Sequence, residues 1–141
     1  MTKRLFLLIV IAIIIVAGGW YLKTSLTIGP SIPDTQQPPL VIVGTDLSIP
    51  VTSPLTITGT AIGPWYFEAS FPVELYDSSN NLLAQAPAQA QSDWMTEDYV
   101  PFSVTLTFVS PGSGTGTLVL RKDNPSGEPA NDASITLPVI F

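Results

Sequence analysis

The chain has neither cysteine nor histidine among its 141 residues, and lysine and arginine together number only five. It therefore has no thiolate nucleophile, no imidazole base and no soft metal ligand. These absences exclude catalytic triads of the common types and structural zinc sites. The lack of cysteine also excludes a lipoprotein anchor. We expect no cofactor, no bound metal and no enzymatic activity.

Positive charge is nearly absent from most of the chain. The region from Thr24 onward contains all 11 acidic residues but only Arg121 and Lys122 as cations, which gives it a formal charge of −9. Nucleic-acid binding depends on clustered Lys and Arg that neutralise phosphates, so nucleic acid is not an expected partner. Acidity of this kind keeps a surface protein soluble.

The N-terminal region is the one long apolar run. Leu5–Leu22 is an uncharged stretch of 18 residues, or roughly 27 Å of helix against the ~30 Å hydrocarbon core of a bilayer. Lys3 and Arg4 precede it and only Lys23 closely follows, so the positive-inside rule keeps the N-terminus in the cytoplasm. We predict that residues 1–23 form a transmembrane signal anchor and that the rest of the chain is extracytoplasmic.

A cleaved signal peptide is the alternative to an anchor. Ala17 and Gly19 are small residues at a plausible cleavage spacing, and cleavage there would release a secreted protein. Residues 24–39 hold four prolines and no aromatic residue, which is typical of a linker. In a polyproline-like conformation this linker would reach about 50 Å at most.

From Leu40 onward, apolar residues alternate with polar ones, which is the strand pattern. Three long runs show it clearly: Phe67–Leu75, Val100–Phe108 and Ile135–Phe141. Shorter candidates are Leu40–Val43, Leu47–Val51, Leu55–Ala61, Leu82–Gln91 and Thr117–Lys122. With no helical period between them, these segments predict an all-β antiparallel sandwich of about 7–8 strands over residues 40–141.

Local signals refine the expected sandwich. Prolines at positions 72, 87 and 101 indicate edge strands or bulges. Asp77–Asn81 contains asparagines that tolerate left-handed backbone angles, so it is expected to close a hairpin. Phe67 is expected to point into the core, with Glu68 as its solvated neighbour.

Several short motifs together resemble the immunoglobulin-like domain of bacterial spore germination. They are Ser53-Pro54-Leu55, Ile57, Gly59-Thr60-Ala61, Phe67-Glu68-Ala69, Asp77, Ile135, Pro138-Val139 and the segment Arg121 to Gly127. The resemblance covers about Leu40 to Phe141. Two departures are Asn80-Asn81, where the family usually has an Asp-x-x-Gly turn, and Gly63 to Tyr66, which lengthens the approach to Phe67. The resemblance implies an immunoglobulin-like β-sandwich that acts as an extracytoplasmic accessory or binding module without catalytic residues.

Aromatic residues are the most specific candidates for ligand contact in this sequence. Trp65, Tyr66, Trp94 and Tyr99 fall in predicted loops or near strand ends, where they could stack on sugars or anchor a protein partner. The alternative is that one tryptophan fills the core, as is common in immunoglobulin-like domains.

Carboxylates suggest two further sites, both weaker candidates: a glycosidase pair and a calcium loop. Glu97 and Asp98 are adjacent, so on a strand they would point to opposite faces rather than across a substrate, as a glycosidase requires. The segment DNPSGEPAND, residues 123–132, gathers oxygen ligands but lacks the spacing of a helix-loop-helix calcium loop, and a turn is the simpler interpretation.

The sequence thus predicts a membrane-anchored, non-catalytic module that binds or organises an envelope protein or glycan. The alternatives are a carbohydrate-binding module with exposed aromatic residues, an assembly or filament subunit, and a weak hydrolase.

Overall fold

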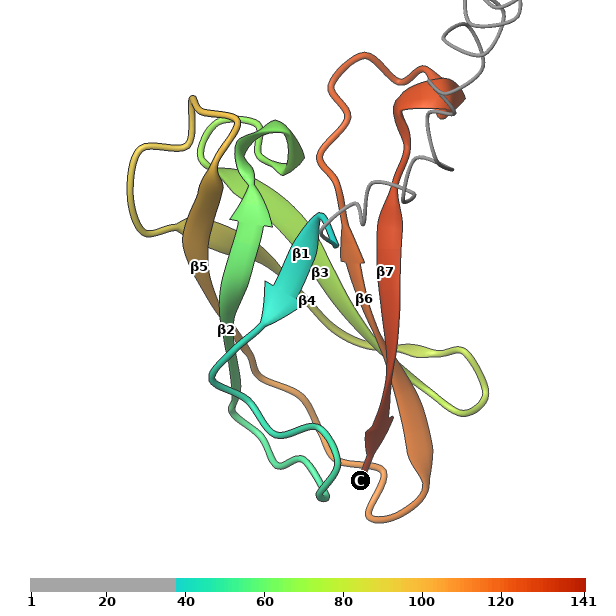
Figure 1. The fold of residues 1–141 in the computed structure, drawn as a ribbon. Coiled ribbons are helices and arrows are strands. Elements are labelled where there is room, and N and C mark those ends of the chain that lie inside the picture. The colour runs from blue at the N-terminus through green and yellow to red at the C-terminus, as the bar shows by residue number, and fades with distance from the viewer. Residues whose placement is uncertain (1–37) are drawn as a thin grey trace, which may run out of the picture. The chain divides into compact units, whose positions relative to one another are not determined.

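Seven β-strands make up the part of the chain that the structure, a computed structural model, describes, namely residues 38–141 (Figure 1). They are β1 (Leu40–Ile42), β2 (Leu55–Ile62), β3 (Ser70–Asp77), β4 (Leu82–Ala90), β5 (Tyr99–Leu106), β6 (Thr115–Arg121) and β7 (Ser134–Ile140). Two single-turn 3-10 helices, η1 (Gly63–Trp65) and η2 (Pro129–Asn131), lie in loops.

The predicted membrane segment falls outside this range. Within residues 38–141, no helix has the length and apolarity needed to cross a bilayer. The predicted span at residues 5–22, the alternative cleavage site and most of the predicted linker lie among the residues that are not described.

All pairings between strands are antiparallel, in the order β1-β2-β5-β4-β3-β6-β7. This confirms the predicted all-β antiparallel fold. The prediction of a strand at Leu47–Val51 was wrong, because only an isolated parallel bridge joins Pro50 to Ile140 there. In that bridge the amide of Val51 donates to the carbonyl of Ile140 at 2.7 Å.

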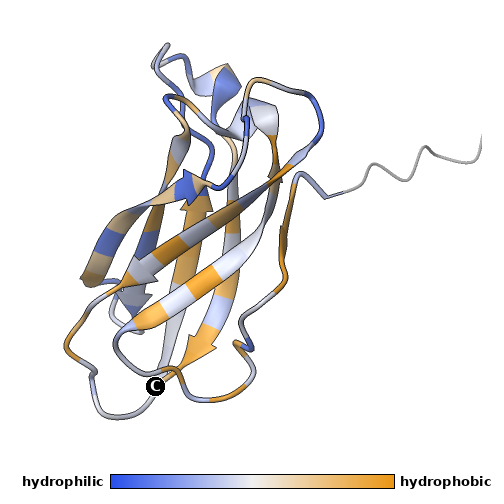
Figure 2. Cartoon of the chain, turned by 90° about the vertical axis from the view of Figure 1, so that its left-hand side faces the viewer, coloured by the Kyte–Doolittle hydropathy of each residue, from blue (hydrophilic) through white to orange (hydrophobic). Residues whose placement is uncertain are grey.

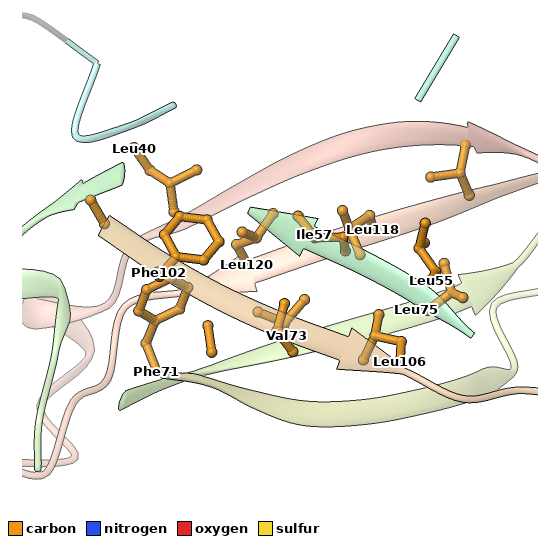
Figure 3. Close-up of a cluster of buried hydrophobic side chains, with 14 of the residues drawn as sticks. Leu40, Leu55, Ile57, Phe71, Val73, Leu75, Phe102, Leu106, Leu118 and Leu120 are labelled. Atoms are coloured by element: carbon orange, nitrogen blue, oxygen red, sulfur yellow. The ribbon is translucent and has the colours of Figure 1, made fainter. Parts of the chain in front are cut away.

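One hydrophobic core fills the space between the two halves of the folded sheet (Figure 3). Phe71 of β3 meets Phe102 of β5 edge to face, with ring centroids 5.0 Å apart. The fully buried side chains around them include Ile57, Val73, Leu75, Leu106, Leu118, Leu120 and Val139. Hydrophobic and hydrophilic positions alternate along the strands, which shows as bands in Figure 2. All of these core residues belong to 38–141, so this segment has a core of its own.

Prolines determine where the sheet divides. Strands β4 and β5 share only two residue pairs, Gln89 with Ser103 and Ala90 with Phe102. The amide of Gln91 donates to the carbonyl of Pro101 at 2.8 Å. In an antiparallel ladder, every second residue of a strand points its backbone nitrogen and carbonyl toward the same neighbouring strand. The nitrogens of Pro87 and Pro101 therefore point into the space between β4 and β5. A proline nitrogen has no hydrogen to donate, so pairing stops and the two halves of the sheet separate.

The beginning of β3 differs from the prediction. Phe67 is 42% exposed, and β3 starts only at Ser70. The amides of Phe67 and Ser70 each donate to the other's carbonyl, at 3.0 and 3.1 Å, around a two-residue turn. Glu68 and Ala69 at its centre both have positive φ, 49° and 63°. The prediction of Phe67 as a core residue was therefore wrong, because the chain reverses direction between it and Phe71.

The predicted Asp77–Asn81 hairpin is present. Its turn places Asn80 at a φ of 65°, and the Asp77 carboxylate accepts hydrogen bonds from the amides of Ser79 and Asn81 at 2.8 Å each. The Asn81 side chain also donates to Asp77, and this hydrogen bond is the main reason that the pKa of the Asp77 carboxyl lies below its usual value.

Candidate functional site

Three loops gather at one end of the domain, which we call the loop end: residues 63–69, 91–98 and 122–133 (Figure 1, upper part). The antiparallel pairing brings them together, because β2, β4 and β6 end where β3, β5 and β7 begin. The first two loops form a hollow of about 330 Å³, lined by Gly63, Pro64, Tyr66, Trp94, Met95, Thr96 and Glu97.

Gly63 allows the two loops to approach this closely. Its amide donates to the carbonyl of Asp98 at 3.1 Å. A Cβ atom at this position would lie 1.7 Å from the carbonyl oxygen of Thr96 and 2.6 Å from that of Trp94. Only glycine leaves room for the 91–98 loop to lie against η1, so this one residue sets the depth of the hollow.

Trp94 and Met95 are the apolar side chains that the 91–98 loop presents. Trp94 is partly buried and packs against the core, whereas Met95 is 75% exposed. The Asp93 carboxylate accepts a hydrogen bond from the Met95 amide at 3.0 Å, and the Thr96 amide donates to the Trp94 carbonyl at 2.9 Å. These bonds fix the local backbone, so the segment that carries Trp94 is held in place while the residue stays partly exposed.

Trp65 and Tyr66, also predicted as contact residues, lie in the core, with 3% and 4% of their surface exposed. Both rings pack edge to face on Phe71, at centroid distances of 5.8 and 5.1 Å. Trp65 therefore fills the core, as the alternative prediction held. Tyr66 forms part of the wall of the hollow but offers no free ring face for stacking.

The Tyr66 hydroxyl is buried and donates to the carbonyl of Val100 at 2.8 Å. Burial raises the pKa of Tyr66 to about 12, above the value of about 10 in an unfolded chain. The neutral phenol thus stabilises the fold below pH 10, and this contribution is lost as the pH rises through 10 towards 12.

We expect this hydroxyl to contribute to the pH dependence of the free energy of unfolding. Between pH 9 and 11.5 the free energy of unfolding of residues 38–141 should fall by about 1–2 kcal/mol more than that of the Tyr66→Phe variant, at about 1.4 kcal/mol per pH unit. Urea unfolding followed by circular dichroism measures both. Parallel pH profiles for the two proteins would contradict the expectation.

Tyr99 lies apart from the hollow. Its hydroxyl donates to the carbonyl of Pro38, and the amide of Ile62 donates to the carbonyl of Pro39 at 3.0 Å. Tyr99 therefore holds the chain where it enters the domain. Of the four predicted contact residues, the structure brings only Tyr66 and Trp94 together in one hollow.

The acidic candidates have ordinary roles in the loops. Glu97 lines the hollow, whereas Asp98 lies beside Thr96, whose hydroxyl accepts a hydrogen bond from the Asp98 amide at 3.1 Å. In the 123–132 loop the side-chain Nδ2 of Asn124 donates to the Asp132 carboxylate at 2.7 Å and to the backbone carbonyl of Glu128 at 2.9 Å. These bonds make a self-supporting turn. No group of three acidic side chains in residues 38–141 is arranged to hold a metal ion.

Met95, Pro64 and the exposed Phe67 were not predicted as contact residues from the sequence. Met95 could have been, because it follows Trp94 as an apolar residue within a polar loop. Phe67 could not, because it continues the alternating pattern of β3. Another hollow, of about 390 Å³, lies beside Pro72 and Pro87, but its aromatic residue, Phe71, is fully buried. The loop-end hollow is thus the better candidate site.

Comparison with known proteins agrees with the fold. A family model, described as the immunoglobulin-like domain of bacterial spore germination, matches residues 49–128. This range extends from the segment before β2 to the loop after β6 and covers more than half of the chain. No curated protein and no solved structure matches. The resemblance seen in the sequence is confirmed, and the chain belongs to the family of the immunoglobulin-like domain of bacterial spore germination.

Proposed function

We propose that this chain is a non-catalytic binding module whose loop-end hollow contacts a partner in the cell envelope. The observation that carries the proposal is that Trp94 and Met95 are presented together beside a preformed hollow. Trp94 is held rigidly on one side by the core, so its exposed part can bury on a partner at little cost in conformational entropy. Tryptophans placed in this way dominate the energetics of many interfaces, and methionine adapts to irregular surfaces.

Residues 5–22 would tether the module to the outer face of a membrane, and residues 24–39 would act as a spacer. The predicted uncharged run and its flanking cations support this arrangement. The spacer joins the domain at Pro38 and Pro39, beside Tyr99 and Ile62.

A capture experiment tests the proposal. The full chain, kept in solution with mild detergent, is immobilised and exposed separately to solubilised envelope proteins and to isolated cell-wall glycan. We expect one bait to be retained, and Trp94→Ala to reduce retention at least tenfold, because loss of a central anchor costs about 2 kcal/mol or more.

Val109→Ala is the matched control. Val109 is 86% exposed in the loop between β5 and β6, at the opposite end of the domain, so its truncation should leave retention unchanged. Equal losses in both variants, or no retention of either bait by the folded protein, would overturn the proposal. Retention of glycan alone would identify a carbohydrate-binding module.

A further inference from the structure

We infer that the partner of the loop-end hollow is a cationic protein segment that carries an apolar side chain; this inference rests on the proposed function. The first observation is the distribution of charge. Seven of the ten acidic residues within 38–141 lie in the three loops of the loop end: Glu68, Asp93, Glu97, Asp98, Asp123, Glu128 and Asp132. The described cations are Arg121, which pairs with Glu74 at 2.8 Å, and Lys122, which lies in the 122–133 loop, so the three loops hold seven carboxylates and one cation.

The second observation is the apolar content of the same surface. Glu97 lines the hollow together with Trp94, Met95 and Pro64. Figure 2 shows hydrophilic loops at this end, above strands banded with hydrophobic residues. A ligand that fills the hollow must therefore cover apolar surface and place its charge beside a carboxylate. A lysine or arginine next to an aromatic or aliphatic residue satisfies both needs.

The same charges disfavour other occupants. Anionic lipid surfaces and polyanionic polymers would be repelled over about one Debye length, roughly 8–10 Å. A neutral glycan could stack on Trp94 and donate hydroxyl hydrogen bonds to Glu97, but it would gain no attraction from the net negative charge of the three loops. Electrostatic complementarity thus selects a basic partner, and the apolar side chains of the hollow, Trp94, Met95 and Pro64, supply most of the affinity.

A random 12-residue peptide display library tests this chemistry without presupposing a sequence. The full chain in mild detergent is the target, and peptides that also bind Trp94→Ala are removed. We expect the remaining peptides to be net positive and to combine Lys or Arg with aromatic or aliphatic residues. Their affinity should fall about two- to fivefold in Glu97→Gln and at higher salt, as for an exposed ion pair.

Glu128→Gln is the matched control, because Glu128 is exposed at the same end but does not line the hollow; its substitution should leave affinity unchanged. Neutral or acidic peptides, or affinity that is indifferent to Glu97→Gln, would overturn the charge inference while leaving a Trp94-dependent binding site in place. Recovery of no Trp94-dependent peptide would overturn the inference, and the capture experiment with envelope proteins and glycan would then decide the proposed function on its own.

Discussion

Phe71→Ala should destabilise the domain by about 3–5 kcal/mol, the range for truncating a fully buried phenylalanine. Phe71 has no exposed surface and meets Trp65, Tyr66 and Phe102 edge to face. Truncation removes all three ring contacts and leaves a cavity between the two halves of the sheet. Because small domains have only about 5–15 kcal/mol of total stability, much of it would be lost. Urea unfolding of residues 38–141 measures the effect.

Phe67→Ala is the matched control for this prediction. The two phenylalanines lie four positions apart, but Phe67 is 42% exposed on the other side of the Glu68-Ala69 turn. Its truncation should cost under about 1 kcal/mol, as at most surface positions. Equal losses of stability at both positions would mean that β3 starts before the turn and that the alternating pattern predicted the burial of Phe67 correctly.

Gly63→Ala should affect both stability and the candidate site. The new methyl group would lie 1.7 Å from the Thr96 carbonyl oxygen and 2.6 Å from that of Trp94. Backbone atoms cannot rotate away from it, so the 91–98 loop must shift. Overpacking of this kind costs about 1–3 kcal/mol. We expect a loss of stability near the upper end of that range, together with a change in Trp94 fluorescence and weaker retention of the partner.

Gly44→Ala separates the steric effect from the general cost of replacing a glycine. A Cβ at Gly44 would lie 2.1 Å from the hydroxyl of Thr58, a side-chain atom that can rotate away. This variant should lose clearly less stability than Gly63→Ala and should retain the partner normally. If Gly63→Ala left both stability and Trp94 fluorescence unchanged, the packing of the two loops would not depend on this glycine.

Alternation in the sequence was sufficient to predict the strands with one buried face. Tyr99–Leu106 and Ser134–Ile140 lie within or close to their predicted ranges because turns interrupt the apolar pattern at their ends. The pattern failed at Phe67. A two-residue hairpin turn with positive φ at both centres usually contains Asn or Gly, whereas here the positions are held by Glu68 and Ala69. Nothing in these residue types marks a reversal, so the alternation continued through it unbroken.

The candidate site could be predicted only in part, for a related reason. Adjacent aromatic residues at a strand end look alike in sequence whether they enter the core or face solvent. Trp65 and Tyr66 are drawn inward because η1 turns the chain over Phe71. Trp94 is only partly buried, in a loop that lies against η1 through the hydrogen bond from the Gly63 amide to the Asp98 carbonyl. The first outcome depends on a turn of the chain within six residues and the second on a contact between segments about thirty residues apart, and the alternation of apolar residues encodes neither.

The hydrogen bond between Val51 and Ile140 has a consequence for how the protein is made. It joins the segment just before β2 to the end of β7, and the same last strand supplies Val139 to the core, with Phe141 beside it packed on Phe108 at a ring-centroid distance of 5.8 Å. Contacts between such distant positions form late, and β-rich domains that depend on them fold in milliseconds to seconds. A nascent chain still held by a ribosome therefore lacks a complete core until residues 139–141 have emerged.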